Sequence, residues 1–339
     1  MLAVRLDNLG DVLVTGPAVR ALAAGSRSVT VLAGPQGAAA AHLLPGVDEV
    51  IVYDAPWVSP DPAALDPARL RELERQLAQR AFDEAVIFTS FHQTPLPAAL
   101  LLRTAGVPRI SAISTDYPGA LLDVRHLVDE DIPESERALS VATAAGFPPP
   151  PGDGGRLAVR GPLPAVDALT PSQPYVVAHP GCSAPARSWP ANRWSETVEA
   201  LTASGHAVVV TGAPSERGLT AQAAGTTGID IGGRTDLRQL AAVLAGAGVL
   251  IAPNTGPAHL AAAVGTPVVS LFAPVVPLSR WSPYGVPCVV LGDQHAPCAG
   301  TRARTCPVPG HPCLSEISAR DVVSAVRSLL IETGREALV

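Results

Sequence analysis

Short apolar runs alternate along this chain with longer segments in which apolar residues recur every three or four positions. In the first half the short runs predict buried strands, at 2–6, 28–32, 49–53, 84–89 and 109–113. The segments between them have helical periodicity, at 12–24, 36–44, 68–80, 96–103 and 134–145. Because parallel strands are joined by helical crossovers, this alternation predicts a parallel sheet with helices on both faces.

The same alternation restarts in the second half. The pattern predicts strands at 175–178, 207–211, 228–231, 249–252, 268–272 and 288–291, and helices at 191–204, 215–225, 236–245, 255–264 and 318–332. Between the halves, 147–174 is dense in Pro and Gly and is incompatible with regular structure. We therefore expect domains at 1–150 and 175–339, the second ending in a C-terminal helix, with a linker at 151–174. Ligands of such sheets bind beyond the carboxyl ends of the strands, in a cleft between domains.

Composition narrows the functional classes. The 339 residues are enough for two α/β domains, and all 24 basic residues are Arg, which excludes a Schiff-base lysine or a lysine-dependent phosphate loop. A net charge of −6 argues against a nucleic-acid partner. Charged residues interrupt the first apolar stretch, and no apolar window reaches the roughly 18 residues of a membrane span. Five Cys in such a chain indicate a reduced protein, in the cytoplasm or peripheral to the inner face of the membrane.

The segment 249–259 is the most informative. An apolar strand is followed by the polar turn Asn254-Thr255-Gly256, and Pro257 then opens an Ala-rich helix. A helix N-terminus at the carboxyl edge of a sheet favours a phosphate or carboxylate through its N–H groups and its dipole. Thr255 adds a hydroxyl, Gly256 allows close approach, and His259 lies on the first turn. The alternative is an ordinary capped helix.

Two positions in the first half carry candidate chemistry. The first strand ends in Leu6-Asp7-Asn8-Leu9-Gly10-Asp11, and a helix is expected to start at Asp11 or at the next residue. Asp11 is therefore either an N-cap or a carboxylate that takes a proton from an incoming hydroxyl. His92 follows the strand at 84–89, where it could contact an acceptor or serve as a capping or core histidine.

The loop after the strand at 175–178 contains Arg187 one turn before Trp189-Pro190. Small residues with one guanidinium suit a bidentate contact with a diphosphate, and the alternative is a surface loop with a solvated Arg. Further on, Cys298, Cys306 and Cys313 form a compact cluster with two His residues. This cluster could bind structural zinc, form a disulfide or remain as reduced thiols, and no Cys-x-x-Cys pair favours zinc.

Together these motifs resemble glycosyltransferase family 9, the ADP-heptose heptosyltransferases, over nearly the whole chain. The motifs are the Leu-Gly-Asp turn, Pro-Gly-x-x-x-x-Ala-Arg-x-Trp-Pro, Gly-Gly-Arg-Thr-Asp-Leu at 232–237, and Asn-Thr-Gly-Pro-x-His. The resemblance implies a GT-B fold: two Rossmann-like domains whose parallel sheets face each other across a cleft. The N-terminal domain would bind the acceptor and the C-terminal domain the nucleotide sugar.

The resemblance also implies residue roles. Asp11 matches the general base. The residues matching the donor diphosphate site are Ser183, Arg187, Thr255, Gly256 and His259. Those matching the nucleoside site are Glu216, expected on the ribose, and Gly233, Thr235 and Leu237, expected along the base. Apart from the resemblance, Asn8 after the first strand and His92 after the strand at 84–89 are the candidate acceptor contacts. Arg187 stands where the family usually has Lys, and Asn254 where Asp is frequent.

The expected reaction is an inverting, metal-independent transfer of a sugar, heptose from ADP-heptose, to an acceptor hydroxyl, without a cofactor. No Asp-x-Asp pair occurs in the loops expected at the cleft, which favours independence of divalent metal. The acceptor could be a glycan, a lipid-linked saccharide or a soluble small molecule. Two alternatives are a nucleotide-sugar 2-epimerase of the same fold and a non-catalytic nucleotide-sugar-binding protein.

Overall fold

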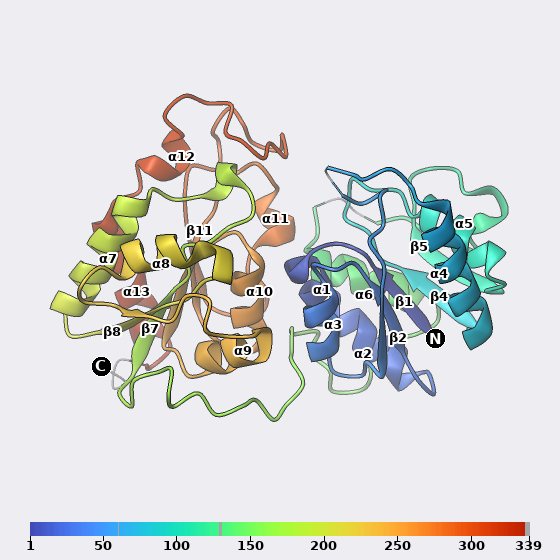
Figure 1. The fold of residues 1–339 in the computed structure, drawn as a ribbon, viewed down its shortest axis with the longest axis horizontal. Coiled ribbons are helices and arrows are strands. Elements are labelled where there is room, and N and C mark those ends of the chain that lie inside the picture. Colours follow the sequence, from blue (N-terminus) through green and yellow to red (C-terminus); the bar gives the residue numbers. More distant parts are fainter. Residues whose placement is uncertain (60, 129–130, 336–339) are drawn as a thin grey trace. The chain divides into compact units, whose positions relative to one another are not determined.

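The computed structural model describes residues 1–59, 61–128 and 131–335. Contacts along the chain divide it into two compact units, Met1–Arg160 and Gly161–Val339 (Figure 1). The division falls between 151 and 174, where the sequence predicts a linker, and 145–174 contains no helix or strand. Residues 336–339, at the end of the predicted second domain, and residues 60 and 129–130, within the predicted first domain, lie outside the described residues.

The first unit contains a parallel sheet of six strands in the order β3-β2-β1-β4-β5-β6. The strands are β1 (Leu2–Arg5), β2 (Thr30–Ala33), β3 (Glu49–Val52), β4 (Glu84–Ile87), β5 (Arg109–Ile113) and β6 (Val124–His126). All four residues of β1 and of β2 are buried, which is the pattern expected where helices cover both faces of a sheet. The register places Leu2 opposite Thr30 on one side and Ala85 on the other.

Helices cover this sheet in two groups, with α1 packed on α3, α2 on α6, and α4 on α5. The helices are α1 (Leu9–Val14), α2 (Gly16–Ala24), α3 (Ala38–Leu43), α4 (Pro67–Arg80), α5 (Leu96–Thr104), the 3₁₀ turn η1 (Gly119–Leu121) and α6 (Glu134–Ala144). Leu73 and Leu77 of α4 and Leu102 of α5 join a core cluster with Val4 and Ile87 of the sheet. These apolar faces bury the helices against the sheet.

The second unit repeats the architecture with the strand order β12-β11-β10-β7-β8-β9, again all parallel. Its strands are β7 (Tyr175–Ala178), β8 (Ala207–Val210), β9 (Ile229–Asp230), β10 (Val249–Pro253), β11 (Val268–Leu271) and β12 (Cys288–Leu291). Its helices are η2 (Pro185–Arg187), α7 (Ala191–Ala203), η3 (Pro214–Glu216), α8 (Arg217–Ala224), α9 (Leu237–Ala245), α10 (Gly256–Ala263), α11 (Leu278–Trp281), α12 (Pro312–Ser315) and α13 (Ala319–Glu332). Helices α7, α8 and α13 share one core cluster with the strands.

In each sheet the strand order reverses at one place, between β1 and β4 in the first unit and between β7 and β10 in the second. Connections on the two sides of such a switch point leave the sheet in opposite directions, so the loops at the carboxyl ends there flank a crevice. The loops after β1, β4, β7 and β10 are therefore the places to look for function.

The structure confirms the predicted alternation and corrects its details. The helix predicted at 12–24 begins earlier, at Leu9, and is interrupted at Thr15. Pro17 has no N–H to donate to the carbonyl of Leu13, which explains the break. Strand β6 was not predicted because it has three residues with Arg125 at its centre and no apolar run. The four-residue helices α11 and α12 are too short to show periodicity.

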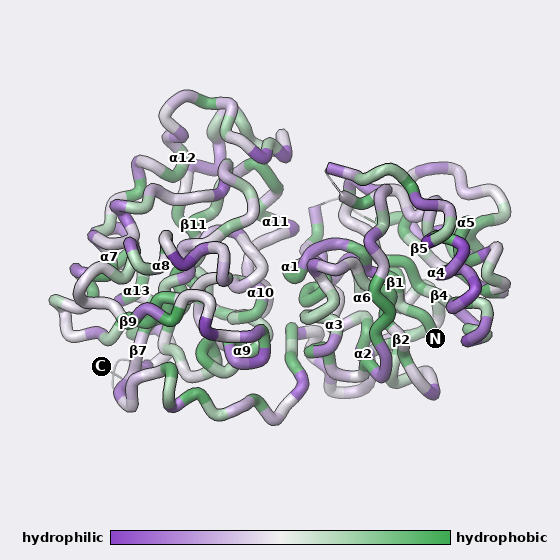
Figure 2. The backbone as a smooth tube through the Cα atoms, in the orientation of Figure 1, coloured by the Kyte–Doolittle hydropathy of each residue, from purple (hydrophilic) through white to green (hydrophobic). Residues whose placement is uncertain are grey.

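Hydropathy along the backbone follows these layers, with α4 largely hydrophilic and β2 largely hydrophobic (Figure 2). The most apolar helices are short, and α10 has only eight residues. Within the described part of the chain, no helix combines the length and the hydropathy that a membrane crossing needs.

Candidate functional site

Arg5, at the carboxyl end of β1, is the centre of the first switch point. It is 3% exposed, although a buried guanidinium needs compensating charge and hydrogen bonds. Its Nε lies 3.0 Å from Asp7 Oδ2, and its Nη2 lies 3.0 Å from Asp11 Oδ1. Two carboxylates, one from the β1–α1 connection and one from the first turn of α1, therefore surround one buried cation.

Asp11 is the third residue of α1, and Asn8 occupies the N-cap position. The interpretation of Asp11 as an N-cap is therefore wrong, because the helix begins at Leu9. Its carboxylate instead accepts hydrogen bonds from Arg5 Nη2 and from Ser90 Oγ, at 3.0 and 3.2 Å, and both donors contact Oδ1. Among the described residues none hydrogen-bonds Oδ2, and the side chain is 16% exposed. One carboxylate oxygen is held and the other is accessible.

The loop after β4 supplies the rest of this site. Buried Ser90 accepts from Arg5 Nη2 at 3.1 Å. Gln93 accepts from the backbone N–H of Ser90 through Oε1 at 3.1 Å and donates through Nε2 to Asp7 Oδ1 at 2.6 Å. The contacts form a closed ring from Asp11 through Arg5, Asp7, Gln93 and Ser90 back to Asp11. We name these five residues the Arg5 network.

Burial dominates the electrostatics of Asp7. It raises the pKa of the Asp7 carboxyl to about 6, although Arg5 opposes the rise and Asp11 adds to it. The Gln93 hydrogen bond favours the ionised form, and Glu134 disfavours it. The sequence prediction missed Arg5, Asp7, Ser90 and Gln93. The available signal was Arg5, a charged residue in an otherwise apolar predicted strand, with Asp7 two residues later.

The two residues predicted to contact an acceptor lie beside this network. Asn8 is exposed and makes no side-chain cap bond, and it separates Asp7 from α1. His92 is exposed and belongs to the same loop as Ser90 and Gln93, with its ring edge-on to Phe91 at 5.3 Å. Both residues therefore belong to the loops that meet at the first switch point.

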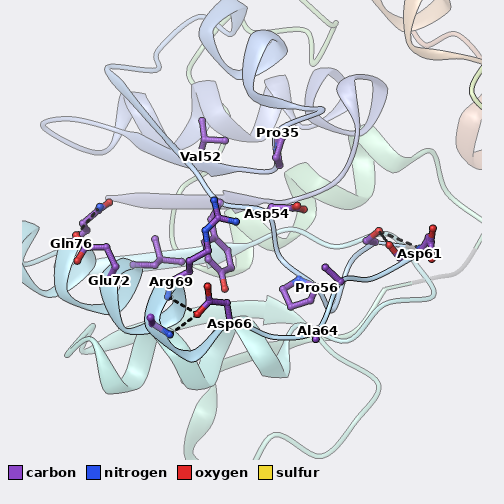
Figure 3. A pocket seen from close by; sticks show the side chains of 15 residues that line it. Pro35, Val52, Asp54, Pro56, Asp61, Ala64, Asp66, Arg69, Glu72 and Gln76 are labelled. Atoms are coloured by element: carbon purple, nitrogen blue, oxygen red, sulfur yellow. Dashed lines mark hydrogen bonds between the residues drawn. The ribbon is translucent and has the colours of Figure 1, made fainter.

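A cavity of about 570 Å³ opens at the carboxyl end of β3, between the β3–α4 connection and α4 (Figure 3). Tyr53 lines it, as do Asp54, Asp61, Asp66, Glu72 and Arg69. Figure 3 shows Asp66 turned towards the start of α4, where its carboxylate accepts from the N–H groups of Ala68 and Arg69. Pro35 also lines the cavity, and the preceding Gly34 packs against the carbonyl oxygens of Leu6 and Asp7. The cavity is therefore next to the β1–α1 connection.

At the second switch point, Arg187 ends the 3₁₀ turn η2 in the loop after β7. Its Nη1 donates to the carbonyl oxygen of Asn254 at 3.4 Å, which brings it to the β10–α10 turn. Burial lowers the pKa of nearby His179 to about 4, and its Nδ1 lies 2.9 Å from Thr211 Oγ1. His179 is therefore neutral, and Arg187 supplies positive charge at this point.

The β10–α10 turn has the predicted strand–turn–helix form. Thr255 is the N-cap of α10 in extended conformation, and Gly256 is the first helical residue. His259, 6% exposed, packs against the Trp281 ring at 6.3 Å between centroids. The amide of Asn254 lies 3.4 Å from Ala273 N and 3.5 Å from Ala273 O. An amide can donate and accept together, which an ionised Asp cannot do.

Glu216 lies where the loops after β7 and β8 meet. Its Oε2 accepts from the N–H of Ala213 at 2.7 Å, and the carboxylate lies directly against Gly181 and Gly212. A Cβ at Gly181 would overlap that carboxylate. The absence of side chains at Gly181 and Gly212 therefore leaves the space that the Glu216 carboxylate occupies.

The other predicted nucleoside residues follow β9 at the same edge. Gly233 has φ +67°, donates to Gly212 O at 2.8 Å and accepts from Arg217 Nη2 at 3.2 Å. Thr235 and Leu237 are half-buried, and Leu237 begins α9. The loops after β8 and β9 are thus joined by one backbone hydrogen bond, and the Arg217 side chain adds a second contact.

Ser183 is exposed in the loop after β7, and its carbonyl accepts from Arg304 Nη2 at 3.2 Å. Ala186 donates to Arg304 O at 2.8 Å. The cysteine-bearing loop therefore supports the loop of Ser183 and Arg187. Cys298 and Cys313 are buried, Cys306 is half-buried, and all three are free thiols. Burial raises the pKa of the Cys313 thiol to about 11.

No group of three His, Cys, Asp or Glu side chains in the part of the chain that the structure describes has a metal-binding arrangement. The chain does contain one Asp-x-Asp sequence, at residues 129–131 after β6. Residues 129 and 130 of it lie outside the described residues. A test of metal dependence must therefore include this segment.

Comparison with known sequences agrees with the motif pattern. The family model described as glycosyltransferase family 9 (heptosyltransferase) matches residues 70–311, more than half of the chain. Lipopolysaccharide heptosyltransferase 1 of Pseudomonas aeruginosa is 36% identical over 138 residues, which is 40% of this chain and 38% of that protein. The match therefore spans well under half the length of this curated relative.

Solved structures resemble the chain over almost its full length. A family 9 glycosyltransferase from Veillonella parvula superposes with a TM-score of 0.77 at 20% identity, covering 98% of this chain and 97% of that one. The ADP-heptose lipopolysaccharide heptosyltransferase II of Escherichia coli gives 0.73 at 21% identity, covering 98% and 99%. At this identity the likeness shows the fold, and it confirms the predicted GT-B architecture of two α/β units.

Proposed function

Since this chain belongs to glycosyltransferase family 9, we propose that it transfers a heptosyl group from ADP-heptose to an acceptor hydroxyl, with inversion and without a metal ion. The observation that carries the proposal is Asp11. Its Oδ1 is held by Arg5 and Ser90, while Oδ2 has no hydrogen bond to the described residues. A carboxylate with one held and one accessible oxygen suits a general base.

The donor is proposed to bind at the second switch point. Arg187 and the N-terminus of α10, with Thr255, Gly256 and His259, would contact the diphosphate, with Ser183 from the same loop as Arg187. Arg187 brings a full positive charge, and the helix N-terminus adds N–H groups and its dipole. Glu216 would accept hydrogen bonds from the ribose, and Gly233, Thr235 and Leu237 would line the base.

In the proposed reaction the acceptor oxygen attacks the anomeric carbon from the face opposite the diphosphate. The new C–O bond forms as the bond to the diphosphate breaks, so the configuration inverts. Asp11 Oδ2 takes the hydroxyl proton, and ADP leaves with the bonding electron pair. Arg187, His259 and the α10 N-terminus would stabilise the charge that grows on the leaving phosphate. These protein groups would perform the task that a divalent metal has in other transferases.

The acceptor is proposed to lie over the β1–α1 connection, with part of it in the cavity beside Tyr53. Asn8 and His92 are proposed to contact it near the reacting hydroxyl. Four carboxylates and one guanidinium line the cavity. Like charges juxtaposed at a binding surface are costly, so this wall favours a neutral or amine-bearing polyol over an anionic core saccharide. Tyr53 also lines the cavity, and an aromatic side chain suits contact with such a molecule.

Release of ADP tests the proposal. The full chain would be incubated with ADP-heptose and one of three acceptor probes: heptose-deficient lipopolysaccharide oligosaccharide, a neutral disaccharide, or an amine-bearing disaccharide. A reaction without acceptor measures hydrolysis, and UDP-N-acetylglucosamine serves as a mismatched donor. We expect acceptor-dependent ADP release, a product heavier by one heptosyl unit, and the same rate after addition of EDTA.

The alternatives give different results. A 2-epimerase would change the configuration of a nucleotide sugar without releasing nucleotide diphosphate by transfer. A binding protein would show a thermal shift with ADP-heptose and no ADP release with any probe. A rate abolished by EDTA and restored by Mg²⁺ would overturn the metal-independent mechanism, and an Asp131→Asn variant would then test the Asp-x-Asp segment.

A further inference from the structure

The burial of Arg5 needs a reason beyond stability. Arg5 is 3% exposed, and Asp7 beside it is 8% exposed. Buried ion pairs recover their desolvation cost only with excellent geometry, and apolar residues of similar size often serve stability as well or better. A strand end that was optimised for stability alone would be apolar, like the other three residues of β1.

The contacts of Arg5 are directed at Asp11. Its Nη2 donates both to Asp11 Oδ1 and to Ser90 Oγ, and Ser90 Oγ donates to the same Asp11 oxygen. The terminal torsion of an Asp side chain is broad, so an Asp without such partners samples many carboxylate orientations. Two donors on one oxygen restrict that rotation and fix the direction of Oδ2.

Arg5 is itself held from behind. Asp7 pairs with its Nε, and Gln93 ties Asp7 to the backbone of Ser90. Helix α6 holds the same loop from another side, because Arg137 Nη1 donates to Thr89 O at 2.7 Å. Arg137 also lies 3.6 Å from Glu134, the other carboxylate that acts on Arg5. The β1–α1 connection and the loop after β4 therefore hold the Arg5 guanidinium, and α6 supports that loop.

We propose that Arg5 is a positioning residue, which aims the accessible oxygen of Asp11 at the acceptor hydroxyl. The inference rests on the proposed function, in which Asp11 takes the proton. Arg5 does not contact the reacting atoms in this scheme. Lys at this position would keep the charge but has a single nitrogen, which cannot reproduce the fork that reaches Asp7, Ser90 and Asp11 together.

The test removes the cation together with its buried partner. Arg5→Met/Asp7→Asn leaves no unpaired buried charge from that pair, and Arg5→Lys is the conservative variant. The matched control is Arg20→Met/Asp153→Asn, which removes another largely buried Arg–Asp pair of the same unit, with contacts of 2.7 and 2.8 Å. Crystal structures of both double variants would be compared with that of the wild-type protein. Turnover would be measured as ADP release from ADP-heptose, with the most active of the three acceptor probes above and with water as acceptors.

We expect Arg5→Met/Asp7→Asn to lose the Asp11–Ser90 contact and to show Asp11 in several orientations. Its kcat should fall by about a hundredfold, the scale of a misplaced reacting group, with KM for ADP-heptose little changed. Arg5→Lys should recover part of kcat, and the control variant should keep wild-type kcat whatever its melting temperature.

A double variant whose Asp11 stays in its wild-type position would overturn the proposal, whether or not either acceptor is used. Wild-type kcat in that variant would do the same. If Asp11→Asn itself retained full turnover, the base assignment would fail instead. An inactive Asp11→Asn beside a fully active Arg5→Met/Asp7→Asn would leave the proposed function intact and reject only the role of Arg5.

Discussion

The two switch points have the same scaffold and opposite chemistry. Each has two adjacent parallel strands, a loop after each strand and a helix that begins within a few residues. At the first, the strand β1 ends in a buried Arg that two carboxylates surround. At the second, β7 and β10 end in loops of small residues, with Arg187 beside the N-terminus of α10.

The difference teaches that charge balance at the strand ends, and not topology, decides what each crevice can bind. Asp7 and Asp11 balance the charge of Arg5, and Asp11 is proposed to be the proton acceptor of the first site. Arg187 donates to a carbonyl oxygen of the β10–α10 turn, and the adjacent helix dipole has the same sign, so the second site favours an anion. One site is proposed to activate the acceptor and the other to hold the donor.

The largest expected effect is that of Asp11→Asn. An amide keeps the shape of the side chain but cannot take a proton, so kcat should fall by at least about a hundredfold. Donor affinity should stay within about twofold, because the donor is proposed to bind in the other unit. Steady-state ADP release and calorimetric titration with ADP measure the two quantities. Near-normal turnover would move the base to another residue, and His92 is the first to test.

The converse effect is expected at the second switch point. Arg187→Ala should weaken ADP binding by about 1.5–3 kcal/mol, the value of a charge-assisted hydrogen bond. Arg187→Lys should lose much less ADP affinity, because Lys keeps the positive charge and is the usual residue of the family at this position. Calorimetry with ADP, and adenosine as a control ligand without phosphate, gives the comparison. Equal losses for ADP and adenosine would mean that Arg187 does not contact the diphosphate.

Most of the fold follows from local pattern. The strands at 109–113, 175–178 and 288–291 have the predicted bounds, because their apolar runs end at turn residues. The failures lie where local signal is weak. Strand β6 has no apolar run of its own and forms by pairing with β5. The helical periodicity continues through Pro17, and the helix is interrupted at Thr15, two residues before that proline.

The candidate site was predicted in part for the same reason. Short motifs mark Asp11, Arg187 and Thr255, because each lies in a strand–turn–helix connection that adjacent residues in the sequence are enough to identify. The Arg5 network joins residues 85 positions apart, Arg5 and Ser90, and nothing in the sequence near Ser90 points to Arg5. Whether a carboxylate caps a helix or pairs with a buried cation depends on such long-range contacts.

A smaller effect is expected from the buried carboxyl of Asp7, on how the stability of the protein depends on pH. Burial raises its pKa from an ordinary 3.8 to about 6, so between these values the folded protein holds a proton that the unfolded chain has lost. Stability contributed by Asp7 therefore falls as pH rises from about 4 to 6. Asp7→Asn removes this term, and the stability of the variant relative to wild type should rise over that window by on the order of 2 kcal/mol. Urea unfolding at pH 4, 5, 6 and 7 measures it, and a constant difference would contradict the raised pKa.

The smallest effect is expected at Gly181, which touches the proposed ribose contact without being part of it. An alanine Cβ there would overlap the Glu216 carboxylate, which is the flexible end of its side chain and can turn away. Gly181→Ala should therefore cost under about 1 kcal/mol of stability. It should weaken adenosine and ADP binding equally, by about three- to tenfold, because a displaced carboxylate makes a longer and weaker hydrogen bond to the ribose. Gly154→Ala, where a Cβ meets open space, is the matched control. Unchanged binding in Gly181→Ala would place the ribose away from Glu216, and the nucleoside would then lie nearer Gly233.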